Sequence, residues 1–183
     1  QVADLNPVGA TGQPKWMVAL GDRVVFNAET ASFGEELWIS DGTPAGTQLL
    51  ADIWPGTASG FTGAPVRIGD QVYFAGSNAT LGGNRVWVTD GTPGGTHSVT
   101  NTYVQPYFAG EYEWTFANGQ LYLVSSDAQH GVALWSLDLV TEQLSLLVDL
   151  SPTLFGIGPT LVEPANGGLF IAERADTTPF AGG

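Results

Sequence analysis

Short apolar runs rich in Val, Phe, Trp and Leu recur along this chain, separated by glycine-containing links. The first two runs, residues 14–20 and 23–28, are joined by a two-residue Gly-Asp link. Two such runs with a tight link predict a β-hairpin. After a loop from Glu29 to Gly34, runs at 36–40 and 47–53 add a third and a fourth strand. The unit ends in Trp54-Pro55-Gly56 and a connector rich in Gly, Ser and Thr.

The order of runs then repeats with a fixed period. Trp38, Trp87 and Trp135 are 49 and 48 residues apart. The apolar pair of the second strand recurs at the same steps, as Val25-Phe26, Tyr73-Phe74, Tyr122-Leu123 and Phe170-Ile171. Four strands in a repeat of about 40–50 residues are typical of a β-propeller blade. The sequence therefore predicts an all-β fold, a β-propeller of four-stranded antiparallel blades that is incomplete in this chain.

The repeat also predicts where one blade ends and the next begins. Residues 3–7, A-D-L-N-P, parallel residues 51–55, A-D-I-W-P, so the chain opens on the last segment of a preceding blade. The expected divisions are 1–12 (outer strand and connector of a preceding blade), 13–63, 64–112, 113–158 (one blade each) and 159–183 (first two strands of a further blade). We expect these residues to be a segment of a longer chain. The alternative is that a partner completes the ring.

A twelve-residue motif lies inside this repeat. It reads E-L-W-I-S-D-G-T-P-A-G-T from Glu36 to Thr47 and R-V-W-V-T-D-G-T-P-G-G-T from Arg85 to Thr96, and a third copy at 133–138 keeps the tryptophan and the aspartate. Side chains alternate along a strand, so Leu37 and Ile39 face one side of the sheet and Trp38 faces the other. In a blade packed between two neighbours, both sides are buried.

The second half of the motif predicts a turn. An aspartate that opens a turn can accept backbone N–H bonds, glycine permits unusual dihedral angles, and threonine hydroxyls add further bonds. We therefore assign a structural role to the motif residues Trp38, Asp41, Gly42, Thr43, Thr47, Trp87, Asp90, Gly91, Thr92, Thr96, Trp135 and Asp138.

The motif resembles the ELWxxDGT repeat proteins of bacteria. The match is tight from Glu36 to Gly56, good from Val86 to Thr96, where Arg85 replaces the glutamate, and looser around Trp135. The resemblance implies a propeller in an exported or surface-associated protein, whether secreted, on the cell surface or periplasmic. That family supplies no established catalytic residues, so the resemblance implies no reaction.

Composition limits the partners. Eighteen acidic residues stand against five Lys or Arg, giving a formal charge of −13, and such a chain offers no basic patch for nucleic acid or anionic lipid. The charge serves solubility or, as an alternative, divalent-cation binding. No cysteine is present, which excludes disulfides and thiolate metal sites. No apolar run approaches the roughly 20 residues that a membrane-spanning helix needs.

Catalytic motifs are absent from the sequence. His97 and His130 lie at non-equivalent places without zinc-ligand spacing, and no serine has a G-x-S-x-G context. Calcium binding by Asp41 and Asp90 would need oxygen donors that the spacing does not bring together. We expect no cofactor and no metal. The acidic residues that could form a hydrolytic pair are Glu29, Glu35, Glu36, Glu111, Glu113 and Asp127.

Aromatic residues mark the places where the repeat is broken. The candidate binding residues are Tyr103, Tyr107, Phe108, Tyr112 and Trp114 in one connector, with Trp54 in another. Such rings either cover a blade interface or channel mouth, or form a shelf for a sugar or a protein partner. We expect a non-catalytic binding or scaffolding module that contacts a protein or further blades. A carbohydrate-binding propeller is the alternative, and an acid-pair glycoside hydrolase a weaker one.

Overall fold

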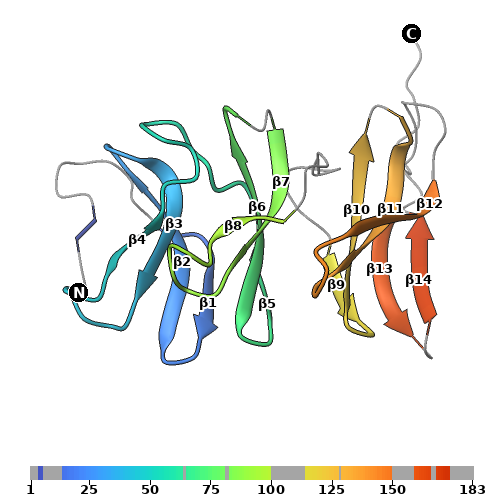
Figure 1. The fold of residues 1–183 in the computed structure, drawn as a ribbon, viewed down its shortest axis with the longest axis horizontal. Helices are drawn as coiled ribbons and strands as arrows, with labels where there is room; N and C mark the ends of the chain where they lie inside the picture. The colour runs from blue at the N-terminus through green and yellow to red at the C-terminus, as the bar shows by residue number, and fades with distance from the viewer. Residues whose placement is uncertain are drawn as a thin grey trace, which may run out of the picture. The chain divides into compact units, whose positions relative to one another are not determined.

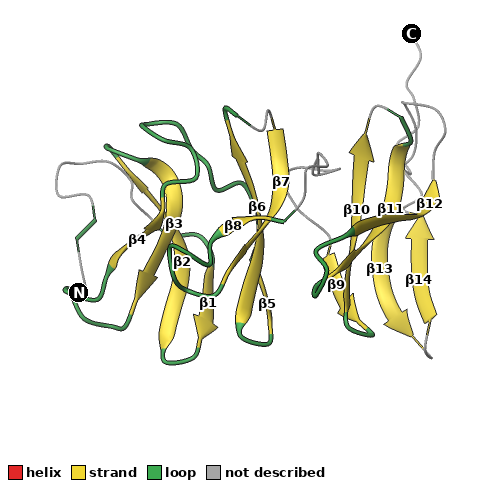
Figure 2. Cartoon of the chain, viewed as in Figure 1, coloured by secondary structure: helices red, strands yellow, loops and turns green. Residues whose placement is uncertain are grey.

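The computed structural model describes residues 4–5, 14–63, 65–80, 83–99, 114–127, 129–149, 159–165 and 168–173. The chain divides into two compact units, residues 1–105 and 106–183, which we treat separately. All regular structure in the described residues is β-strand (Figures 1 and 2). None of these residues forms a helix able to cross a bilayer.

The first sheet of unit 1, sheet 1, contains four antiparallel strands in chain order. They are β1 (Met17–Leu20), β2 (Arg23–Thr30), β3 (Gly34–Ser40) and β4 (Gln48–Ala51). Gly21 closes the β1–β2 hairpin at φ 63°, a conformation that glycine adopts without steric cost. The register shifts between Leu37 and Trp38, where β4 carries one extra residue, Leu50, as a bulge against β3.

The second sheet of unit 1, sheet 2, repeats this order. Its strands are β5 (Val66–Ile68), β6 (Gln71–Asn78), β7 (Gly83–Thr89) and the short β8 (His97–Ser98). The connector from sheet 1 joins it, because Phe61 forms a bridge with Gly76 and the Ser77 N–H donates to the Gly60 carbonyl at 2.8 Å. The two sheets are thus tied together by backbone as well as by side chains.

A continuous apolar core lies between sheets 1 and 2. The members that are buried are Leu20, Val25, Leu37, Ile39, Leu50, Ile53, Phe61, Val72 and Phe74. A row of aromatic rings runs through this core, with centroids 5.9 Å apart from Trp16 to Phe61, 5.3 Å from Phe61 to Phe74 and 6.3 Å from Phe74 to Trp87. Each fully buried aliphatic or aromatic side chain contributes about 1.5–3 kcal/mol to folding. This core is what holds one repeat against the next.

Unit 2 holds a third four-stranded sheet, sheet 3, and a hairpin. The strands of sheet 3 are β9 (Trp114–Ala117), β10 (Gln120–Asp127), β11 (Gly131–Asp138) and β12 (Leu144–Asp149), again antiparallel neighbours in chain order. Asn118 and Gly119 both have positive φ in the β9–β10 turn, as expected of an Asn-Gly hairpin. The hairpin consists of β13 (Pro159–Ala165) and β14 (Gly168–Glu173), and its strand β13 lies beside β9 and β10.

The predicted all-β fold is confirmed, because the described residues form three four-stranded antiparallel sheets with the same strand order. The expected Glu29–Gly34 loop is wrong in its bounds, because β2 continues to Thr30 and β3 begins at Gly34. Polar residues pair there, Glu29 opposite Glu35, where the apolar pattern had already ended. The fourth strand of the second repeat, expected at residues 97–102, is described only as His97–Ser98, and residues 100–102 lie outside the described residues.

Candidate functional site

The two D-G-T turns have the same hydrogen-bond network. Asp41 Oδ1 accepts the Thr43 N–H at 2.9 Å and the Thr43 hydroxyl at 2.7 Å, and the Thr47 hydroxyl donates to the Thr43 carbonyl at 2.7 Å. Ser40 and Thr47 share a hydroxyl–hydroxyl bond of 2.7 Å across the base of the turn. The side chains of this turn therefore bond to the turn itself.

The second turn reproduces these bonds 49 residues later. Asp90 Oδ1 accepts the Thr92 N–H at 2.8 Å and its hydroxyl at 2.6 Å, while Thr89 and Thr96 share a 2.7 Å bond. In both turns these threonine bonds, the hydroxyl first, lower the pKa of the aspartate. Gly91 has φ 83°, which explains glycine after the aspartate.

The third copy keeps the buried tryptophan and the aspartate that accepts backbone N–H bonds in the turn. Asp138 Oδ1 accepts the Thr141 N–H at 2.8 Å and the Val140 N–H at 2.9 Å, and these bonds lower the pKa of Asp138. Trp135 is buried in β11, with the His130 ring edge-on at 5.6 Å. His130 is thus a packing neighbour of the motif tryptophan.

Glu36, the first motif residue, is fully buried and clamps the connector after β4. Its carboxylate accepts backbone N–H bonds from Ile53 at 2.8 Å, Trp54 at 3.2 Å and Gly60 at 2.7 Å. Burial raises the pKa of Glu36 to about 7, and the neighbouring Asp52 charge adds to the rise, whereas the three N–H bonds oppose it. Asp52 Oδ1 is itself buried without a hydrogen-bond partner among the described residues.

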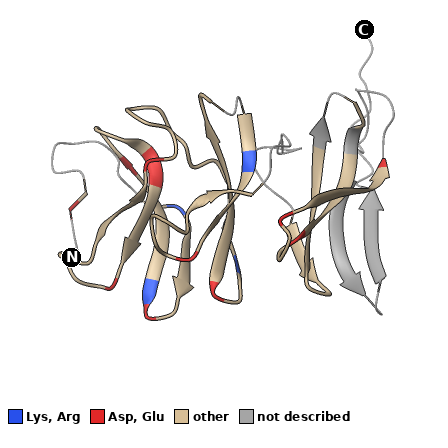
Figure 3. Ribbon diagram, in the orientation of Figure 1, with Lys and Arg blue, Asp and Glu red and all other residues tan. Residues whose placement is uncertain are grey.

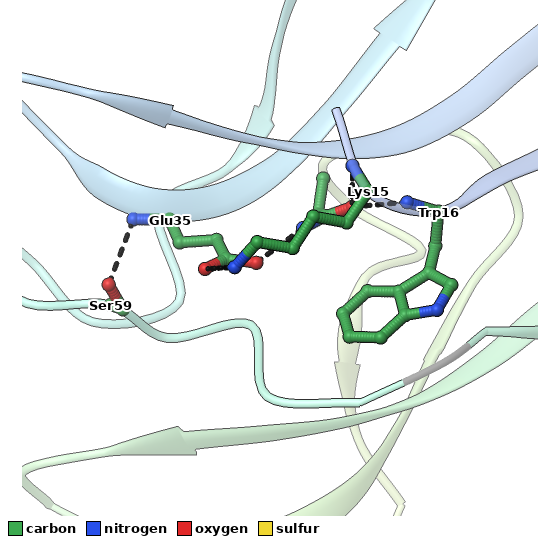
Figure 4. A network of polar contacts seen from close by, with 5 residues as sticks. Lys15, Trp16, Glu35 and Ser59 are labelled. Atoms are coloured by element: carbon green, nitrogen blue, oxygen red, sulfur yellow. Dashed lines mark hydrogen bonds and ion pairs between the residues drawn. The ribbon is translucent and has the colours of Figure 1, made fainter. Parts of the chain in front are cut away.

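Glu35, the neighbouring residue in β3, belongs to a different network (Figure 4). Its carboxylate forms an ion pair with Lys15 Nζ at 2.9 Å and accepts a hydrogen bond from the Asn27 amide. Its backbone N–H donates to the Ser59 hydroxyl at 3.1 Å. Asn27 Oδ1 in turn accepts the Trp16 N–H at 2.8 Å, so the network joins the start of β1 to β2, β3 and the connector.

The candidate acids Glu35 and Glu36 therefore belong to two separate hydrogen-bond networks. Glu29 and Glu35 are cross-strand neighbours, but Glu29 is exposed and both Glu35 oxygens accept hydrogen bonds. Glu36 follows Glu35 directly in a strand, so the two side chains leave it in opposite directions. Glu111 and Glu113 lie outside the described residues, and nothing is described of the Asp127 side chain.

Two of the six aromatic candidates, Trp54 and Trp114, belong to the described residues, one in each unit. Trp54 is partly buried, and its backbone N–H bonds to Glu36. Trp114 is partly buried at the start of β9 in the other unit. The other four, Tyr103, Tyr107, Phe108 and Tyr112, lie outside the described residues. Their binding role stays a prediction.

Charged groups do not converge on a metal-type site in the described residues. Figure 3 shows acidic residues on several turns and strands, with the basic residues apart from one another. No three His, Asp or Glu side chains are placed to hold an ion together in the part of the chain that is described. His97 is exposed in β8, far in sequence from His130.

One side of sheet 1 carries an apolar patch that the described residues of this unit leave partly exposed. We call it the Trp38 face: Phe26, Ala28 and Trp38 are buried there, and Leu5, Phe33 and Leu49 pack against them. Beside them lies a pocket of about 280 Å³, whose lining includes Leu5, Met17, Val24 and Phe26. Met17 is 69% exposed and Val24 37% exposed.

Sequence reasoning missed three features of this region: the Lys15–Asn27–Glu35 network, the Glu36 clamp and the open Trp38 face. A polar residue inside the apolar run V-V-F-N-A signals the first. The glutamate directly before L-W-I signals the second. No local signal gives the third, because exposure depends on which sheet lies opposite.

Comparisons with known proteins give structural likenesses only. No protein-family profile matches the chain, and no curated protein matches it. Solved structures that resemble it include TolB from Acinetobacter baumannii, at 15% identity and TM-score 0.49, covering 84% of this chain and 38% of TolB. An α-L-arabinofuranosidase (CtGH43) from Clostridium thermocellum ATCC 27405 has 13% identity and TM-score 0.43, with 91% of this chain and 64% of that one covered.

A third structure, Xyloglucan PUL GH43B of Bacteroides ovatus, has 15% identity and TM-score 0.43, with 87% of this chain and 35% of that one covered. The chain thus spans between 35% and 64% of the length of these three proteins. At such identities and TM-scores the likenesses carry no argument about activity.

Proposed function

We propose that this chain is a propeller-type array of ELWxxDGT-like repeats that acts as a non-catalytic protein-binding or scaffolding module outside the cytoplasm. The observation that carries the proposal is the use of its acidic side chains. Glu35 and Glu36 bond to Lys15, Asn27 and the connector, and Asp41 and Asp90 bond within their own turns. These groups hold the repeat together.

The hydrolase alternative requires a different arrangement. Glycoside hydrolysis by two carboxyl groups needs one group that protonates the leaving oxygen and a second that attacks or activates water. Glu35 is committed to a cation and an amide donor, and Glu36 to three backbone N–H groups. The described acids therefore favour a structural over a catalytic role.

Hydrolysis and binding can be measured with one set of variants. The chain, Glu29→Gln and Glu35→Gln would be incubated with a panel of aryl glycosides and polysaccharides. We expect no turnover by any of them. Turnover that is lost in Glu29→Gln or Glu35→Gln, with the fold intact by circular dichroism, would contradict the proposal and support the hydrolase alternative.

Protein binding needs its own experiment. We expect a photo-crosslinkable form of the chain, added to an extracytoplasmic fraction, to label a defined protein, and excess unlabelled chain to abolish that labelling. Quenching of tryptophan fluorescence by a soluble glycan, lost on replacement of Tyr107 and Trp114, would instead support the carbohydrate-binding alternative. Absence of both would contradict a binding function.

A further inference from the structure

The Trp38 face of sheet 1 can be compared, residue by residue, with the same face of sheet 2. Val24 and Val72 are equivalent positions 48 residues apart, and Phe26 corresponds to Phe74. Val72 and Phe74 are fully buried, because sheet 1 covers them in the core between the sheets. Val24, by contrast, is 37% exposed. Phe26 is buried, as Phe74 is, so the same surface is closed in one repeat and exposed around Val24 and Met17 in the other.

The turn glycines differ in the same way. A methyl group added at Gly91 would meet Arg23, Leu20 and Ile39 of sheet 1, and the Gly91 carbonyl accepts a hydrogen bond from Arg23 at 3.1 Å. The equivalent Gly42 has open space around it. Aliphatic side chains and one arginine of sheet 1 thus surround Gly91 in sheet 2. No described residue surrounds Gly42 in the same way.

The position of Leu5 indicates which segment of a repeat packs on the Trp38 face. By repeat register Leu5 is equivalent to Ile53, within the shared A-D-L and A-D-I segments. Ile53 follows β4 of sheet 1 and is buried in the core against sheet 2. Leu5 packs on the cluster of Phe26 and Trp38. The segment that ends a repeat is therefore already seated where the preceding repeat would lie.

From these three equivalences we propose that the Trp38 face is a docking surface for one further four-stranded sheet of this same repeat, joined through the Leu5 segment. That sheet presents branched aliphatic side chains in the places of Val25, Leu37 and Ile39, and an arginine in the place of Arg23 that bonds the Gly42 carbonyl. The inference rests on the repeat-array part of the proposed function. It specifies the partner surface by its chemistry.

The absence of cysteine from the chain gives a direct test. Val24→Cys and its matched control Val72→Cys would be made in the 183-residue chain and in an extended chain, in which a copy of residues 14–50 directly precedes Ala3. Thiol labelling by a maleimide would be followed for each. In the 183-residue chain we expect Val24→Cys to react at least about tenfold faster than Val72→Cys, because labelling of a buried thiol requires local opening.

In the extended chain we expect the rate at Val24→Cys to fall to about that of Val72→Cys, and the control to be unchanged. Undiminished labelling of Val24→Cys, or an added repeat that gives no additional β signal in circular dichroism, would overturn the proposal. Slow, concentration-dependent labelling in the 183-residue chain would overturn it in favour of a second copy. None of these outcomes depends on hydrolysis or on an external protein partner, so the proposed binding function can fail separately.

Discussion

Replacing Glu36 by glutamine removes an ionisable group from the clamp on the connector. The wild-type carboxylate is fully buried and accepts N–H bonds from Ile53, Trp54 and Gly60. Burial and the Asp52 charge raise the pKa of Glu36 from 4.5 to about 7. A glutamine keeps the shape of the side chain but cannot titrate. The variant should therefore lose the pH dependence that Glu36 gives to the stability.

The sign follows from the direction of the shift. Between about pH 4.5 and 7 the folded chain holds a proton on Glu36 that the unfolded chain has released. The stability from this group is therefore fully present below about pH 4.5 and is lost as the pH rises through about 7. At 1.36 kcal/mol for each pKa unit, the difference between the two limits is roughly 3 kcal/mol.

Urea unfolding followed by tryptophan fluorescence would measure this difference. We expect the free energy of unfolding of the wild type, minus that of Glu36→Gln, to fall by roughly 3 kcal/mol between about pH 4 and about pH 8. Because the other groups titrate in both proteins, their contribution cancels. The exposed Glu29→Gln would be measured in parallel as the control.

A pH-independent difference between wild type and Glu36→Gln would refute the reasoning. It would mean that the N–H bonds, which favour the ionised form, fully offset the desolvation of the carboxylate. Carbon-13 NMR titration of the Glu36 carboxyl would then locate the pKa near its ordinary value.

Three further predictions concern the clamp and the turns. Asp52→Asn should shift the titration of Glu36 to lower pH in the same NMR experiment, because it removes a nearby negative charge. Gly95→Ala should lower the stability by roughly 1–3 kcal/mol, since its methyl group would lie 2.2 Å from the Asp90 carboxyl, whereas Gly94→Ala, with open space, should be nearly neutral in urea unfolding. Because its pKa is lowered in the folded chain, ionised Asp90 stabilises the fold above the usual carboxyl pKa, and this stabilisation is lost in acid. In thermal melts, the difference in stability between wild type and Asp90→Asn should therefore shrink as the pH falls below about 4.

Much of the fold could be predicted from the sequence because its elements are local. The Gly-Asp and Asn-Gly links and the apolar runs give the hairpins, and the step from Trp38 to Trp87 gives the repeat. Strand ends were less predictable, because the Glu29–Glu35 pairing extends β2 and β3 beyond the apolar residues. The candidate binding aromatics in residues 103–112 lie outside the described residues and stay a prediction.

The sequence by itself determined the repeating units, the turn chemistry and the alternation that places Leu37 and Trp38 on opposite sides of β3, since each depends on residues close together in the chain. Tertiary structure alone decided that Glu36 clamps Gly60, 24 residues away, and that Val72 is covered while its equivalent Val24 is partly exposed. Burial and desolvation depend on which surfaces meet, and equivalent residues in successive repeats meet different neighbours. That is why similar sequence in the two repeats gives one closed face and one face that is partly exposed.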